Sequence, residues 1–297
     1  MTLRLGTRGS ALALAQASWV AERLREDVEL VEITTSGDRG GGPGDKSRFV
    51  KEIEEALLRE EIDLAVHSAK DVPGELPGGL SIVGVPERAD ARDALCGAAS
   101  LDSLSAGAIV GTGSLRRRAQ LAALRPDLEV RDLRGNVDTR LRKLAEGNYD
   151  ALVLARAGLE RLGRGSEGAP IPESSLVPAA GQGCLALEAR TGDGEAADAA
   201  AAITDQNALT TLTAERAVVA ALDASCHTPV GAHATPNGEK RLQLTGFVGM
   251  PDGSHWIRDE LDADATDPAA AGREIAQRLL AAGAAELLAA SERASLR

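Results

Sequence analysis

One layout, a strand followed by a polar turn and a serine-capped helix, occurs twice in the first 125 residues and most constrains the fold. Residues 3–6 form an apolar strand, and Ser10 precedes a helical periodicity that continues to residue 25. Residues 108–111 form another short strand, and Ser114 precedes a helix that ends near residue 124. Further elements are predicted at 28–35, 49–59, 62–66, 128–132, 137–144, 151–154 and 157–162. Because strands alternate with helices, we expect parallel sheets in two similar lobes that face a cleft.

The pattern changes toward the C-terminus. A strand is predicted at 181–188 and a long helix at 204–222. Antiparallel strands follow at 241–249 and 255–261, around a Pro-Asp-Gly turn, and an alanine-rich amphipathic helix at 268–291. The length of 297 residues is enough for two or three domains. The predicted fold class is α/β, with two lobes around a cleft and a smaller α+β domain at the C-terminus.

Basic residues are concentrated in one part of an acidic chain. The formal net charge is −12, yet residues 111–145 hold nine Lys or Arg against four Asp or Glu. The acidic remainder repels nucleic acid, so we expect no nucleic-acid partner and a small anion with several carboxylates or phosphates. The acidic composition, with 28 Arg and 5 Lys, fits a GC-rich genome or a high-salt cytoplasm.

Three strand-to-helix turns could bind such an anion. Gly111–Arg118 combines free backbone N–H groups, two hydroxyls and adjacent guanidinium groups, and Leu133–Arg140 follows the next strand. Thr7–Ser10 has the same place in the first lobe. The arginines alone would also suit a solvated helix face, and a phosphate ligand stays open although no Walker-type motif is present. Arg118 has no expected role in binding.

Two other segments carry reactive groups. Asp71 follows a buried strand in His67–Pro73, and at the carboxyl end of that strand it could hold a substrate N–H or exchange a proton. As a surface carboxylate it would simply pair with Lys70. Cys226 lies in a predicted loop and is followed by His227, which favours a reachable thiolate. Cys96 and Cys184 are expected to be small buried residues.

Several functions are disfavoured. No run of 18 apolar residues predicts a membrane span, and no paired Cys/His spacing predicts a metal site. The first residues are expected to be a strand rather than a signal peptide. Three cysteines far apart argue against a disulfide framework, so we expect a cytoplasmic protein.

The motifs together resemble those of the porphobilinogen deaminases, the tetrapyrrole-pathway enzymes also called hydroxymethylbilane synthases. The matching segments follow the order of that family and span nearly the whole chain. They are Thr7–Leu14, Phe49–Glu52, Ala65–Pro73, Gly111–Arg117, Leu133–Val137, Ala157–Leu159, Gly181–Gly183, Thr213–Arg216 and Cys226.

The resemblance implies a fold and a cofactor. It implies two periplasmic-binding-protein-like lobes, 1–86 with 177–203 and 87–176, and a cofactor-attachment domain, 204–297. A dipyrromethane built from two porphobilinogen units is expected to be thioether-linked to Cys226. Four more units are then added head to tail with loss of ammonia, and water releases 1-hydroxymethylbilane. The family also suggests a monomer.

The resemblance assigns roles to single residues. Asp71 is expected to be catalytic, because a carboxylate can stabilise the cation that forms when ammonia leaves and can hydrogen-bond pyrrole N–H groups. The residues expected to bind the cofactor besides Cys226 are Ser68, Lys70, Thr112, Ser114, Arg116, Arg117, Arg134 and Arg140. Those expected to bind substrate are Arg8, Ser10, Lys46, Arg161 and Gln182.

Two segments depart from the family pattern. The loop before Phe49 is short, and Lys46 is the candidate for the lysine that the family has there. Ser225 stands before Cys226 where the family often has glycine, and a serine suffices unless the position needs a positive φ.

Two rival functions differ in their requirements. A non-catalytic carboxylate-binding protein needs neither Asp71 nor Cys226, and a cysteine hydrolase needs a histidine placed on the thiolate and an oxyanion hole.

Overall fold

The computed structural model describes residues 2–36, 50–225 and 228–295. Its first lobe is built on a five-stranded sheet with the order β2-β1-β3-β10-β4. These strands are β1 (Leu3–Arg8), β2 (Val28–Ile33), β3 (Leu64–Ser68), β4 (Leu80–Gly84) and β10 (Leu185–Arg190). The second lobe has a five-stranded sheet with the order β7-β6-β8-β5-β9. Its strands are β5 (Asp93–Cys96), β6 (Ile109–Gly111), β7 (Glu129–Arg131), β8 (Ala151–Ala155) and β9 (Gly168–Pro170).

Both sheets have the same plan, which confirms two similar lobes. In each, three parallel strands are followed by an antiparallel strand, β10 or β5, that the chain supplies after crossing from the other lobe. The crossings are residues 85–92 and 171–184. The prediction of parallel sheets is confirmed for three strands of each lobe, but it missed the antiparallel pairs, because helix alternation does not identify a strand that enters from the other lobe. Strand β10 also begins at Leu185 rather than at residue 181.

Helices cover the two sheets. Those of the first lobe are α1 (Ala11–Ala21), α2 (Lys51–Leu58) and α6 (Gly194–Ala202), and those of the second are α3 (Leu115–Leu124), α4 (Val137–Ala145) and α5 (Arg156–Arg161). Ser10 caps α1 as predicted, with its side chain accepting a hydrogen bond from the Ala13 N–H. Ser114 occupies the N-cap position of α3, but its side chain makes no capping hydrogen bond. It is therefore available for other contacts.

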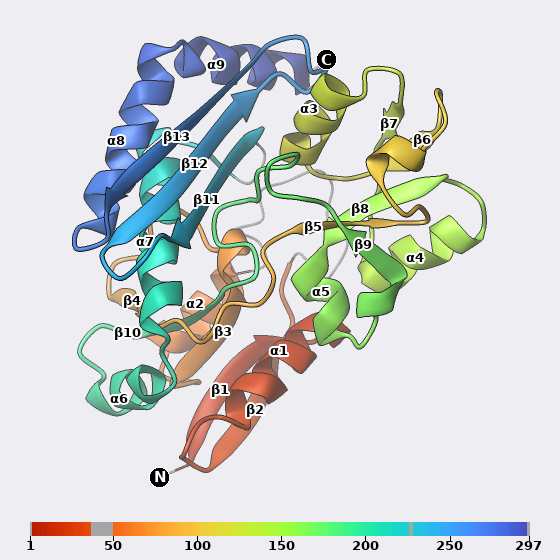
Figure 1. Cartoon of the computed structure of the whole chain (residues 1–297). Coiled ribbons are helices and arrows are strands. Elements are labelled where there is room, and N and C mark those ends of the chain that lie inside the picture. Colours follow the sequence, from red (N-terminus) through yellow and green to blue (C-terminus); the bar gives the residue numbers. More distant parts are fainter. Residues whose placement is uncertain (1, 37–49, 226–227, 296–297) are drawn as a thin grey trace.

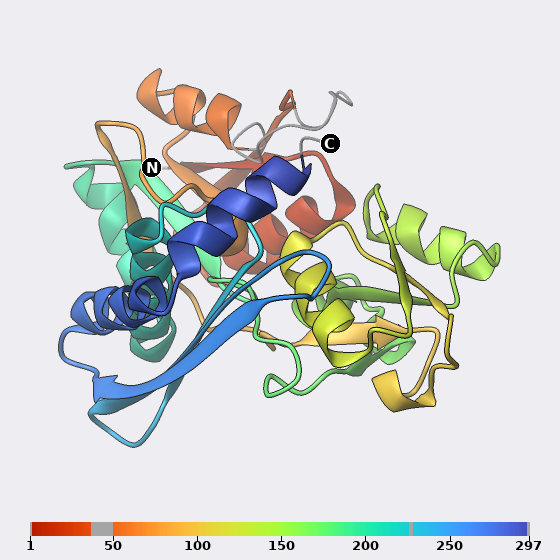
Figure 2. The same cartoon turned by 90° about the horizontal axis from the view of Figure 1, so that it is seen from above.

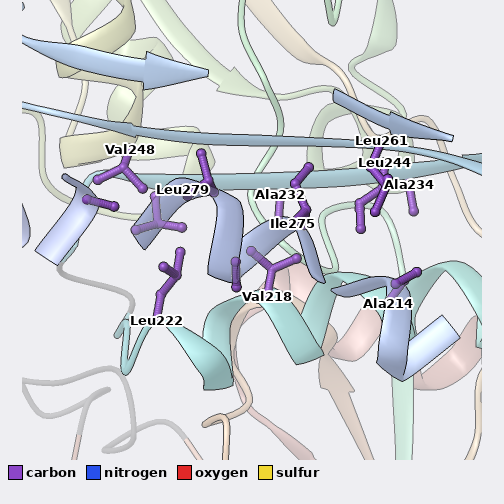
Figure 3. Close-up of a cluster of buried hydrophobic side chains, with 14 of the residues drawn as sticks. Ala214, Val218, Leu222, Ala232, Ala234, Leu244, Val248, Leu261, Ile275 and Leu279 are labelled. Atoms are coloured by element: carbon purple, nitrogen blue, oxygen red, sulfur yellow. The ribbon is translucent and has the colours of Figure 1, made fainter. Parts of the chain in front are cut away.

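A third sheet belongs to the C-terminal domain, which follows α7 (Gln206–Ala221). Strands β11 (Val230–Pro236), β12 (Arg241–Gly249) and β13 (Trp256–Asp264) are antiparallel neighbours in that order. Figure 3 shows their apolar side chains packed against those of α7 and of α8 (Pro268–Ala281). The predicted helix at 268–291 is two helices, α8 and α9 (Ala284–Ser295), because Gly283 has a φ of +102°.

The three parts meet at the middle of the molecule (Figures 1 and 2). The strand ends that precede α1, α3 and α4 are carboxyl ends, so the polar turns lie at one edge of their sheets. Helix α7 of the C-terminal domain packs against the first lobe through a cluster that includes Ala69, Val72 and Leu212. No helix in the described part of the chain is long and apolar enough to cross a membrane.

Candidate active site

One cavity is lined by all three parts of the chain. The first lobe contributes Lys70 and Asp71, and the second contributes Ser114 and Arg116. The C-terminal domain contributes Arg216 of α7 and the residues on both sides of positions 226 and 227, which are Ala224, Ser225 and Thr228. Cys226 itself lies outside the described residues, as does Lys46. The cavity therefore joins the predicted acid and three predicted binding residues, Lys70, Ser114 and Arg116, to the loop that contains the predicted attachment site.

The turn that carries Asp71 is held at both ends. It is a short 3-10 helix, Ala69–Asp71, directly after β3. The Ala69 N–H donates to the Cys184 carbonyl at 3.1 Å, which ties the start of the turn to the segment before β10. The Arg216 guanidinium donates to the carbonyls of Pro73 at 2.7 Å and Gly74 at 3.0 Å, just beyond the turn. These contacts fix the backbone on which the Asp71 carboxylate faces the cavity.

The two arginines that begin α3 are buried and share one carboxylate. Arg116 Nη1 lies 2.8 Å from Asp93 Oδ2, and Arg117 Nη2 lies 2.8 Å from Asp93 Oδ1. Burial alone would raise the pKa of Asp93, but the two guanidinium groups hold it well below its usual range. Because one anion faces two cations, the site keeps an excess positive charge that a ligand carboxylate can neutralise.

Gln182 links these arginines to the first lobe. Its side-chain amide donates to Asp93 Oδ1 at 2.8 Å, and its amide oxygen accepts from Lys70 Nζ at 3.2 Å and from Arg117 Nη2 at 3.4 Å. The flanking Gly181 and Gly183 both have positive φ, and a Cβ on Gly183 would meet the Ala89 carbonyl oxygen at 2.3 Å. The two glycines of the Gly-Gln-Gly motif therefore allow the backbone conformation that places the Gln182 side chain between Lys70, Asp93 and Arg117.

Three further arginines of the predicted binding set have different surroundings. Burial and the charge of Arg117 lower the pKa of Arg140 to about 10, while the charge of Asp71 opposes that shift. Arg140 therefore interacts electrostatically with both Arg117 and Asp71. Burial lowers the pKa of Arg161, and this side chain donates to the Gly183 carbonyl at 2.7 Å. Arg134 is exposed, and within the described part of the chain its guanidinium makes no hydrogen bond or ion pair.

The remaining predicted residues have mixed positions. Thr112 is buried, and its hydroxyl accepts from the Ser114 N–H at 3.3 Å. Ser68 ends β3, and Arg8 ends β1 at the equivalent edge. Arg118 lies outside the cavity, as expected, because it donates to Asp132 and to the Val130 carbonyl. Position 225 does not require glycine, because Ser225 does not have a positive φ. In the described part of the chain, the non-glycine residues with positive φ are Glu60 and Asp223.

Sequence reasoning missed a buried network at the crossings between the lobes. Arg88 Nη1 donates to Glu215 Oε1 at 2.7 Å, and Arg88 Nε donates to the Gln182 carbonyl at 3.0 Å. Glu215 Oε2 also accepts from the Gly181 N–H at 2.6 Å, and His233 Nδ1 lies 3.2 Å from Oε1. Burial would raise the pKa of Glu215, but Arg88 and His233 lower it to about 2. Its charge was visible in the sequence, but its partner 127 positions away was not.

A second buried cluster lies behind the Asp71 turn. His67 Nε2 on β3 is 3.0 Å from Glu188 Oε2 on β10, and both side chains are almost fully buried. Glu54 of α2 is the third member, because burial and the charge of Glu188 raise its pKa to about 7 while His67 opposes the shift. The cluster thus contains one carboxyl group that changes protonation near neutral pH.

We expect Asp93→Asn to destabilise the protein by about 3 kcal/mol, because it removes the shared anion from two buried cations. Urea unfolding of the two proteins at pH 7 measures this difference in the free energy of unfolding. Asp132→Asn is the matched control, since Asp132 pairs with Arg118 at the surface and is 69% exposed. Its effect should be about 0.5 kcal/mol or less. Equal effects of the two substitutions would contradict the shared-anion interpretation.

We expect Glu54→Gln to change how stability depends on pH. A raised carboxyl pKa means that the folded protein holds a proton between about pH 4.5 and 7 that the unfolded chain releases, so wild-type stability falls as pH rises through that window. The neutral glutamine should remove that fall and gain about 1–2 kcal/mol relative to wild type at pH 8. Unfolding curves at pH 5, 6, 7 and 8 test it, with the half-exposed Glu55→Gln on the same helix as control.

The fold and the cavity define a class of protein, a two-lobed α/β protein with a third domain and one carboxylate among arginines where the parts meet. Two family models match the chain. Residues 3–198 match "Porphobilinogen deaminase, dipyromethane cofactor binding domain", and residues 209–281 match "Porphobilinogen deaminase, C-terminal domain".

Curated relatives cover nearly the whole chain. A porphobilinogen deaminase of Thermus thermophilus is 48% identical over 96% of this chain and 97% of that protein. One of Deinococcus radiodurans is 48% identical over 97% of this chain and 98% of that protein. One of Brevibacillus brevis is 45% identical over 96% of each. The chain therefore belongs to the porphobilinogen deaminase family of transferases.

The fold class was correctly predicted as α/β, with two similar lobes and a smaller C-terminal domain. A solved periplasmic substrate-binding protein from Coxiella burnetii is similar at 14% identity, with a TM-score of 0.43 over 70% of this chain and 94% of that one. This likeness is distant, and the assignment depends on the strand order of the two sheets.

Proposed function

We propose that the chain condenses four porphobilinogen molecules head to tail onto a dipyrromethane attached at Cys226, releases ammonia at each step, and hydrolyses the product to 1-hydroxymethylbilane. The observation that carries this proposal is the shared cavity. Asp71 lines it together with Ser225 and Thr228, which flank positions 226 and 227. A catalytic carboxylate and an attachment loop on one cavity are what a tethered, growing chain needs.

The residues around the cavity suit a dipyrromethane. Each pyrrole ring carries an acetate and a propionate, and arginine binds a carboxylate through two parallel hydrogen bonds. When bound, this group would supply the free pyrrole α-carbon to which the first new unit is added, and each later unit would be added to the end of the growing chain. We propose that the residues holding its carboxylates and N–H groups are Ser68, Lys70, Thr112, Ser114, Arg116, Arg117, Arg134 and Arg140.

Asp71 is the proposed catalytic residue. Its carboxylate lines the cavity and lies within the electrostatic field of Arg140. A substrate that loses ammonia becomes positively charged, and the surrounding arginines would disfavour that charge. A carboxylate at this position supplies the opposing charge and accepts hydrogen bonds from pyrrole N–H groups, which lowers the barrier.

The incoming substrate is proposed to bind beside Gln182 and the side chains that it contacts. Arg8 and Arg161 would take its carboxylates, and Lys46 would add a charge from outside the described residues. Gln182 is buried and bonded to Lys70 and Arg117, and Ser10 caps α1, so we propose that these two act by holding neighbouring groups.

The boundaries of the parts are proposals too. The strand plan supports a first lobe of 1–86 with 177–203, a second lobe of 87–176 and a C-terminal domain of 204–297. We also propose that the protein is a monomer and that it acts in the cytoplasm. The odd number of widely separated cysteines supports the cytoplasmic location. Light scattering of the purified protein tests the oligomeric state.

One experiment separates this function from its rivals. The purified protein is incubated with porphobilinogen, and ammonia, the linear tetrapyrrole and the intact protein mass are measured. The proposal requires ammonia release, 1-hydroxymethylbilane and a mass that exceeds the sequence mass by one dipyrromethane. A carboxylate-binding protein would bind porphobilinogen without releasing ammonia and would have the plain sequence mass.

A further inference from the structure

Glu188 is a buried carboxylate that the proposed mechanism does not use. It lies on β10 with none of its surface exposed, and its Oε2 is 3.0 Å from His67 Nε2. No described residue gives either Glu188 oxygen a well-aligned hydrogen bond. His67 is four positions before Asp71, on the strand that leads into the catalytic turn.

The contact between Glu188 and His67 fixes how β10 pairs with β3. In this antiparallel pair Ala186 is opposite His67 and Glu188 is opposite Ala65, so Glu188 and His67 are diagonal neighbours on one face. A shift by one residue would move the Glu188 carboxylate to the opposite face, which packs in an apolar cluster with Leu185 and Leu187. The pair therefore selects one register.

That register controls the neighbours of the catalytic turn. The Ala69 N–H donates to the Cys184 carbonyl, directly before β10. Two residues earlier, the Gln182 side chain accepts from Lys70 Nζ at 3.2 Å. A displaced β10 would move both contacts, and with them the position of Asp71.

The backbone just beyond Asp71 is held by Arg216. Burial lowers the pKa of Arg216, and the charge of Glu188 opposes that shift, which places the two groups in each other's field. Arg216 in turn donates to the carbonyls of Val72, Pro73 and Gly74.

We infer that Glu188 is a positioning residue for the Asp71 turn, and that it acts through His67 and through the pairing of β10 with β3. Replacing a buried ion pair by apolar residues is often neutral or stabilising, so stability alone is a weak reason for this arrangement. Catalysis, in contrast, is sensitive to displacements of the order of 1 Å. The inference rests on the proposed function, because it assumes that Asp71 acts on porphobilinogen.

The test compares Glu188→Gln with Glu54→Gln, which removes a carboxyl group from the same cluster but not from β10. Both holoenzymes are purified, their cofactor content is checked by intact mass, and kcat and KM for porphobilinogen are measured well below the unfolding temperature. We expect Glu188→Gln to lower kcat by about tenfold or more with little change in KM, and Glu54→Gln to leave both within about twofold.

A folded, cofactor-loaded Glu188→Gln enzyme with wild-type kcat would overturn the inference. If that variant does not fold, His67→Asn gives the same test, and wild-type kcat there is equally contrary. Similar losses in Glu188→Gln and Glu54→Gln would point to general weakening of the core and also reject a positioning role. The proposed function fails separately, when wild type itself releases no ammonia from porphobilinogen.

Discussion

Asp71→Asn is expected to keep the cofactor and lose nearly all turnover, with kcat at least about 100-fold below wild type. Asparagine preserves the shape of the side chain and one hydrogen-bond acceptor but removes the negative charge. The cavity would then present Lys70, Arg116 and Arg216 to a substrate that becomes positively charged as ammonia leaves. Ammonia release and porphobilinogen consumption measure the rate, and intact mass shows whether the dipyrromethane is present.

Glu75→Gln is the matched control for Asp71→Asn. Glu75 is an exposed carboxylate four residues further along the same segment. It is absent from the cavity wall, so its removal should leave kcat and KM near their wild-type values. Normal turnover in Asp71→Asn would remove Asp71 from the catalytic role. Loss of activity in both variants would indicate that the segment as a whole, rather than this carboxylate, is required.

Cys226→Ala should abolish the attached cofactor and with it all turnover. A thioether needs a sulfur atom at the attachment position, and alanine offers none. The mass of this variant should equal its sequence mass, whereas wild type should exceed its own by one dipyrromethane. Because the arginines remain, the variant should still bind dipyrromethane non-covalently, and dialysis should remove it.

The other cysteines serve as controls for this prediction. Burial raises the pKa of Cys96 to about 11 and that of Cys184 to about 12, so neither thiol is ionised or reachable at neutral pH. Cys96→Ala should therefore keep the extra mass and most of the activity. A cofactor mass that persists in Cys226→Ala would place the attachment on another residue.

Local sequence signals predicted most of the regular structure of the lobes. Strand β1, helix α1 with its Ser10 cap, and the hairpin strand β12 are where periodicity places them. Strands β4, β5, β9 and β11 were missed, because each is short or lies in a segment without clear alternation. Pairing across a lobe boundary leaves no local pattern, so the antiparallel placement of β10 and β5 could not be predicted from their own residues, although β10 was predicted as a strand.

The candidate site was predicted in its charged groups but not in their partners. Asp71, Arg116 and Ser114 do meet at one cavity. Asp93 was not predicted, although it holds both Arg116 and Arg117. A buried ion pair depends on which residues the fold brings together, and the sequence separation of 23 or 24 positions carries no periodic signal. The role of Arg116 and Arg117 in binding the carboxylates of the cofactor stays a prediction.

The ion pair of Arg88 with Glu215 bears on how such a chain could lose or gain parts in evolution. Arg88 lies in the first crossing between the lobes, and Glu215 lies in the helix that begins the last third of the chain. Shortening the chain to the two lobes alone would remove the Glu215 carboxylate that holds Arg88, and the guanidinium would keep only its contact with the Gln182 carbonyl.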